Sequence, residues 1–182
     1  MYPYTIQTLV DEAKKHSDNT ILYSNWNIIN DTGDILREFQ ESNYNELSAF
    51  EYNVRLLDGQ QINVNTTLIP THLFERCKIR ELDDPVTIDY DFFLRSTLLY
   101  GTKFHLISKP LAKYRIHTDQ LSHKNISKTL DYIEEIKNEI LIQLDDSLQK
   151  KYTNELQLYQ KTKPAKRKTM ELGMKLISST PS

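Results

Sequence analysis

The segment Asp89-Tyr90-Asp91 places two carboxylates at the junction between a polar loop and an expected helix. Acids at this position can cap the helix, because a carboxylate accepts hydrogen bonds from the free amide groups of the first turn. A carboxylate held at the edge of a loop can also accept a proton from a substrate hydroxyl. Residue types and spacing leave both interpretations of Asp89 open.

A second chemically capable segment is Tyr114-Arg115-Ile116-His117. If the segment is a strand, Arg115 and His117 point to the same face. Both side chains donate hydrogen bonds to anionic oxygens and therefore suit a phosphate group. Histidine also ligates divalent metals. The alternative is an exposed edge strand that carries two polar side chains.

Two charged clusters complete the candidate list. The acids Glu81, Asp83 and Asp84 are interpreted as a solvated loop. The basic run near the C-terminus is either solvated or attracted to an anionic membrane surface, where each cation adds on the order of 1 kcal/mol. This run contains Lys161, Lys163, Lys166, Arg167 and Lys168.

The sequence has no pattern for a phosphate-binding loop, a disulfide or a zinc site. Only four glycines are present, and none of them forms a phosphate-binding loop. A single cysteine, Cys77, allows no intramolecular disulfide. Zinc-type spacing is absent among the five histidines, which are His16, His72, His105, His117 and His123.

Length and composition set the remaining limits. A chain of 182 residues fits one ordinary domain with additional helix, and a formal net charge of −2 argues against a nucleic-acid-binding protein. No apolar run reaches about 18 residues, and the N-terminus has no signal-peptide pattern, so we expect a cytoplasmic protein.

The candidate residues must be positioned by an α/β fold. Periodicity and turn signals predict a helix, a β-hairpin, a helix, a strand, two more helical segments, a strand pair and a helical tail. The expected segments are Thr5–Lys15, Thr20–Ile29 with Ile35–Phe39, Ser48–Leu57, Ile62–Ile69, Pro70–Cys77, Tyr90–Tyr100, Lys103–Ser108 with Leu111–Ile116, and helices from Asn125 onward that break near Leu144–Ser147. We expect residues 1–123 to form one unit and residues 124–182 a helical extension.

In this order, the pieces resemble the acceptor-side half of a family 2 glycosyltransferase with the GT-A fold. The resemblance rests on the segments 89–95, 101–104 and 109–117 with Leu121-Ser122, and on weaker similarity in the segments 21–33 and 65–77. It covers about 100 residues, from about Tyr23 to Ser122. No piece is specific alone, and the ordered set carries the similarity.

The resemblance implies a partial GT-A (Rossmann-like) mixed sheet flanked by helices, and a role for each candidate. Asp89 would take the proton from the acceptor hydroxyl as that hydroxyl attacks the sugar, with inversion at the anomeric carbon. Asp91 lies on the same helix, where it supports the base or helps to bind substrate. Arg115 and His117 would face the diphosphate of the nucleotide-sugar donor, and His117 would reach a divalent metal, Mg²⁺ or Mn²⁺.

Two departures from the family pattern qualify these roles. The family has a glutamate directly before its catalytic aspartate, and this chain has Ile88, so the carboxylate that orients the acceptor is either missing or supplied by Asp83 or Asp84. The nucleotide-binding half and its metal-binding DxD motif would precede Met1. We therefore expect the donor and the metal to bind only when that half is present, either in an N-terminal partner chain or in a longer form of this protein. The alternative is a non-catalytic module that binds glycan or protein.

Overall fold

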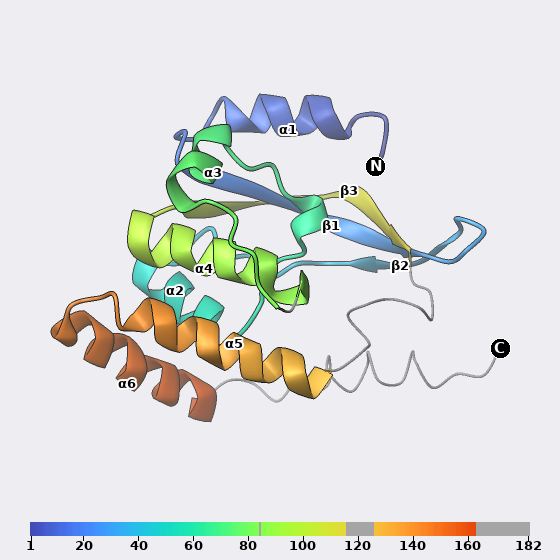
Figure 1. Ribbon diagram of the computed structural model, residues 1–182. Helices are drawn as coiled ribbons and strands as arrows, with labels where there is room; N and C mark the ends of the chain where they lie inside the picture. The colour runs from blue at the N-terminus through green and yellow to red at the C-terminus, as the bar shows by residue number, and fades with distance from the viewer. Residues whose placement is uncertain (84, 116–125, 163–182) are drawn as a thin grey trace.

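The computed structural model describes residues 1–83, 85–115 and 126–162 of the chain (Figure 1). The fold is mixed α/β, with a three-stranded sheet flanked by helices and a helical C-terminal part. Its elements are α1 (Thr5–Ala13), β1 (Thr20–Ile29), β2 (Ile35–Phe39), α2 (Ala49–Leu57), the 3₁₀ turn η1 (Val64–Thr66), α3 (Thr71–Cys77), the 3₁₀ turn η2 (Pro85–Thr87), α4 (Ile88–Tyr100), β3 (Lys103–Arg115), α5 (Ile126–Leu141) and α6 (Asp146–Thr162).

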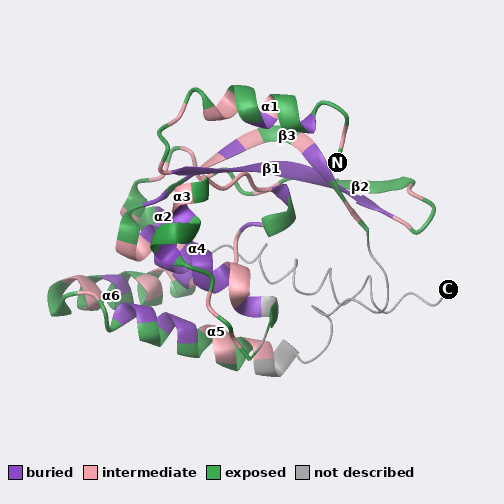
Figure 2. Ribbon diagram, turned by 45° about the horizontal axis from the view of Figure 1, so that its top comes forward, coloured by how far each residue is buried: buried purple, intermediate pink, exposed green. Residues whose placement is uncertain are grey.

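The sheet has the order β2-β1-β3 and is mixed. Strand β1 forms the predicted antiparallel hairpin with β2 and runs parallel to β3. All ten residues of β1 are buried, because it is the central strand and helices cover both of its faces. Figure 2 shows this burial along β1.

Alternate residues of β1 serve two separate cores. On one face, Leu22 packs with Leu9 of α1 and Leu111 of β3. On the other face, Ile21 and Tyr23 belong to a larger core that includes residues of α2, α4, α5 and α6. Helix α1 therefore covers one side of the sheet, and the other helices of this core cover the opposite side (Figure 1).

The C-terminal helices share the larger core with the rest of the chain. Ile136 and Ile140 of α5 and Tyr152 of α6 are buried in it. The Asn53 side chain donates a hydrogen bond of 3.0 Å to the Tyr152 hydroxyl and so connects α2 to α6. The predicted break between the two helices is confirmed, since α5 ends at Leu141 and α6 begins at Asp146.

The predicted strand at Ile62–Ile69 is wrong. This segment forms the 3₁₀ turn η1, and its only strand-like pairing within the described residues is an isolated bridge between Leu68 and Leu22. The reason is local: the Asn63 side chain accepts a hydrogen bond from the Asn65 amide, which offers the backbone a partner other than a neighbouring strand.

The predicted strand pair Lys103–Ser108 and Leu111–Ile116 is one strand, β3. Its parallel register with β1 shifts around Asn25, which pairs with Pro110. A proline has no backbone N–H to donate, and the irregularity in the ladder accommodates it.

Candidate active site

Helix α4 sets the position of Asp89. The helix begins at Ile88, two residues earlier than expected, and ends at Gly101 in the left-handed conformation with φ 65°. Near this end, the Asn19 side chain donates hydrogen bonds to the carbonyls of Tyr100 and Gly101, and the Asn19 carbonyl accepts from the Lys103 amide. The C-terminus of α4 thus lies where β1 and β3 begin, and its N-terminus, with Asp89, lies toward their carboxyl ends (Figure 1).

Two hydrogen bonds hold the Asp89 carboxylate. Its Oδ2 accepts from Gln60 Nε2 at 3.0 Å, and its Oδ1 accepts from the Tyr90 amide at 2.8 Å. Burial raises the pKa of Asp89 above the ordinary value of 3.8, and the two hydrogen bonds oppose this shift without cancelling it. A carboxylate with a raised pKa is a stronger base than an exposed aspartate.

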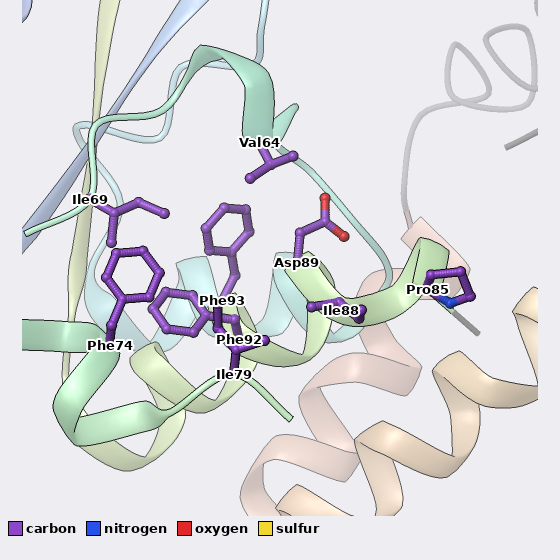
Figure 3. Close-up of a pocket in the computed structure, with 9 residues that line it drawn as sticks. All are labelled: Val64, Ile69, Phe74, Ile79, Pro85, Ile88, Asp89, Phe92 and Phe93. Carbon is purple, nitrogen blue, oxygen red and sulfur yellow. The ribbon is translucent and has the colours of Figure 1, made fainter. Parts of the chain in front are cut away.

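The carboxylate lies at one side of an open pocket of about 420 Å³ (Figure 3). The wall is otherwise apolar, and among the described residues that line the pocket Asp89 alone is charged. The rings of Phe74 and Phe92 stack in this wall, with their centroids 5.1 Å apart. The lining residues are Val64, Ile69, Phe74, Ile79, Pro85, Ile88, Asp89, Phe92 and Phe93.

We expect the raised pKa of Asp89 to make stability depend on pH. Between 3.8 and the raised value, the folded protein holds this proton more tightly than the unfolded chain does. Stability of the wild type should therefore fall as pH rises through this window and then level off. Asp89→Asn lacks this slope, so urea unfolding should show the wild type losing stability relative to the variant. Parallel stability curves, or a carboxyl NMR midpoint at or below 3.8, would contradict the shift.

Asp91 does not line the Asp89 pocket, and its carboxylate is bound by two arginines. Its side chain is 1% exposed, and Oδ2 accepts from Arg95 Nη2 at 2.7 Å and Arg95 Nε at 3.0 Å. Arg80 donates to both carboxylate oxygens and also pairs with Glu139 of α5 at 2.8 Å. These contacts explain Asp91 as a structural ion pair, and its role in substrate binding stays a prediction.

The proposed diphosphate-facing pair is only partly described. Arg115 ends β3, and its guanidinium donates to the carbonyls of Asn30 and Asp31 in the turn between β1 and β2. It is not among the residues that line the Asp89 pocket. His117 lies outside the described residues, so its predicted donor and metal contacts stay predictions.

The basic run is also mostly outside the described residues. Lys161 is exposed in the last turn of α6, and the other four basic residues of the run follow the described part of the chain. Among the helices of residues 1–83, 85–115 and 126–162, none combines the length and the apolar composition needed to cross a bilayer.

The described residues around Asp89 do not fit a magnesium or manganese site. Such ions take several oxygen ligands. Asp89 is the one carboxylate in the pocket wall, and both oxygens of Asp91 accept hydrogen bonds from guanidinium groups. The prediction that the metal binds together with a separate nucleotide-binding half stays a prediction.

Sequence reasoning missed two features. Gln60, just after the turn that ends α2, holds Asp89, and no local pattern signals this contact. The second feature is a cluster of Glu12, His16 and His105 on the opposite face of the sheet. The four-residue spacing of Glu12 and His16 could have suggested a pair, but the third member comes from a distant strand.

A scan against protein-family models finds no match for this chain, and a search of the curated proteins finds none either.

Proposed function

We propose that this chain carries the acceptor-side part of an inverting glycosyltransferase of the GT-A type, with Asp89 as the general base. The observation that carries the proposal is the Asp89 carboxylate, half-buried with a raised pKa at the side of an open pocket. The ordered sequence resemblance assigned the same residue to the same role. No other charged side chain among the described residues lines this pocket.

The proposed step is one displacement. The acceptor hydroxyl attacks the anomeric carbon of the donor sugar while its proton passes to an oxygen of Asp89. The bond from that carbon to the donor diphosphate breaks, the diphosphate leaves with the electron pair, and the configuration inverts. Gln60 and the Tyr90 amide orient the carboxylate for the transfer.

The pocket wall suits an acceptor with an apolar face. Sugar rings present C–H groups on one side, and these groups pack against aromatic side chains such as Phe74 and Phe92. An apolar aglycone would use the same wall.

The nucleotide-binding half and its Mg²⁺ or Mn²⁺ belong, in this proposal, to residues outside this chain, either in the same polypeptide or in a partner. The competing function is a non-catalytic module that binds glycan or protein in the same pocket. The apolar lining favours binding of this kind as well as transfer. The two functions differ in whether the Asp89 carboxylate is required.

Acceptor binding can be mapped by amide NMR with a panel of glycosides that carry polar or apolar aglycones. We expect shifts at pocket residues, and we expect Phe74→Ala to weaken binding about fivefold, because the loss of an aromatic wall contact costs about 1 kcal/mol. Phe39→Ala is the matched control, since Phe39 stacks on Trp26 and does not line the pocket.

The proposal fails if no glycoside in the panel shifts the pocket amides. It also fails if Phe74→Ala and Phe39→Ala weaken binding equally, because the bound sugar would then lie elsewhere.

A further inference from the structure

Helix α1 and strand β3 bring three potential metal ligands together on the face of the sheet opposite the Asp89 pocket. Glu12 lies in the last turn of α1, and His16 follows one turn later on the same side. His105 lies near the start of β3, where it pairs with Leu22 of β1. Packing of Leu9 against Leu22 seats the helix over this part of the sheet.

The ligand atoms have the spacing of a metal site. Glu12 Oε1 lies 3.3 Å from His16 Nε2 and 3.6 Å from His105 Nε2. All three ligand atoms lie within 4.8 Å of one another. In a tetrahedral zinc site with bonds of about 2.0–2.1 Å, neighbouring ligand atoms are about 3.3–3.4 Å apart. An ion can therefore be bound with small movements of side chains.

We propose that Glu12, His16 and His105 form a binding site for a divalent transition-metal ion, with Zn²⁺ as the ion that fits the donor set best. Two imidazole nitrogens and one carboxylate oxygen are ligands that zinc accepts, whereas Mg²⁺ and Ca²⁺ prefer oxygen donors alone. The three side chains are 21–26% exposed, so water can reach the ion as a fourth ligand.

The surroundings favour the ligating forms of these groups. Lys15 Nζ binds Glu12 Oε2 at 2.8 Å, whereas Oε1 faces the two imidazole nitrogens that would share the ion. Hydrogen bonding from Lys15 lowers the pKa of Glu12, which keeps it ionised. Burial, followed by the nearby charge of His16, lowers the pKa of His105 and so favours the neutral imidazole that binds metals.

The close approach of the two histidines is itself informative. Their ring centroids lie 4.0 Å apart, with the planes tilted by 39°. Two protonated imidazoles at this distance would repel each other, and an ion between their Nε2 atoms and Glu12 replaces those protons. The ion would also fasten the end of α1 to β3, because the site takes ligands from both elements.

Isothermal titration of the untagged full-length chain with ZnCl₂ tests the site. We expect one ion per chain. Removal of an outer partner of a metal ligand typically costs 10–100-fold in affinity, so loss of a direct ligand in His16→Ala or His105→Ala should cost at least about tenfold. His72→Ala is the matched histidine control and should bind as the wild type does, because His72 on α3 is not in the cluster.

Hydrogen exchange gives a second readout. At about a hundredfold excess of Zn²⁺ over its dissociation constant, exchange of the α1 amides should slow by up to about a hundredfold, since opening of the helix breaks the site. Glu12→Gln and His105→Gln keep polar side chains at these positions, and both should lose this protection even if an alanine variant folds poorly.

Three results would overturn the site: no saturable binding up to millimolar Zn²⁺, unchanged affinity in the His16→Ala/His105→Ala double variant, or no slowing of α1 exchange. Asp89→Asn should bind zinc normally, because Asp89 lies on the other side of the sheet. Failure of the glycosyltransferase proposal therefore leaves this test unaffected, and the reverse is also true.

Discussion

Replacing Asp91 by alanine is expected to lower the free energy of unfolding by about 3 kcal/mol. Removal of one partner of a buried ion pair typically costs about 3–5 kcal/mol, because the remaining charge is left without compensation. Arg95 is 8% exposed and would be that charge. We expect the lower end of the range because Arg95 also donates to the carbonyls of Cys77 and Lys78.

The position of Asp91 explains why this pair matters for the site. Arg95 ties α4 to the end of α3, and Arg80 ties both to Glu139 of α5. Asp89 stands two residues before Asp91 on the same helix, so the ion pairs fix the helix that presents the candidate base. Arg80 also loses a partner in Asp91→Ala. This loss costs less than the loss at Arg95, because Arg80 is 34% exposed and still pairs with Glu139.

Urea unfolding checks this expectation with Asp11→Ala as the matched control. Asp11 also pairs with a cation, Lys14 at 3.0 Å, but its side chain is 52% exposed. The control should leave the unfolding midpoint unchanged. If Asp91→Ala were as stable as Asp11→Ala yet failed to bind glycosides, Asp91 would be a substrate-binding residue and not a structural one.

Replacing Asp89 by asparagine is expected to lower the rate of sugar transfer by about 10²–10⁴-fold, the usual contribution of a positioned general base. The fold should tolerate the change. Asparagine has nearly the same shape as aspartate and can keep one of the two hydrogen bonds, because its Oδ1 can accept from the Tyr90 amide or from Gln60 Nε2. Acceptor binding should also persist, because the apolar wall is unchanged.

Much of the fold could be predicted because local signals and tertiary packing agree. The segment Thr20–Ile29 has the two alternating faces of a strand and lies between two turn signals, and β1 has these bounds. Gly101 has a positive φ that L-residues rarely adopt, and α4 ends there as expected. Around Asn63, local hydrogen bonds of the side chain outweighed the alternating pattern, so the predicted strand did not form.

The candidate site could be predicted only where a single element determines it. Asp89 was identifiable because the first turn of a helix holds it. Its partner Gln60 comes from another part of the chain, and the contact depends on how α2 packs against α4. The same reason hid the Glu12, His16 and His105 cluster, since linear spacing contains no information on the docking of α1 against β3.

The most direct measurement compares sugar incorporation into glycan in cells of the source organism that lack the native gene and carry the wild type, Asp89→Asn or Asp146→Asn. Asp146 is the charge-matched control, because it is an exposed aspartate in the first turn of another helix, α6, and does not line the Asp89 pocket. We expect incorporation to fall at least about a hundredfold with Asp89→Asn and to remain at the wild-type level with Asp146→Asn. Equal incorporation by all three proteins, each present at the same level, would contradict a catalytic role for Asp89 and favour the non-catalytic module.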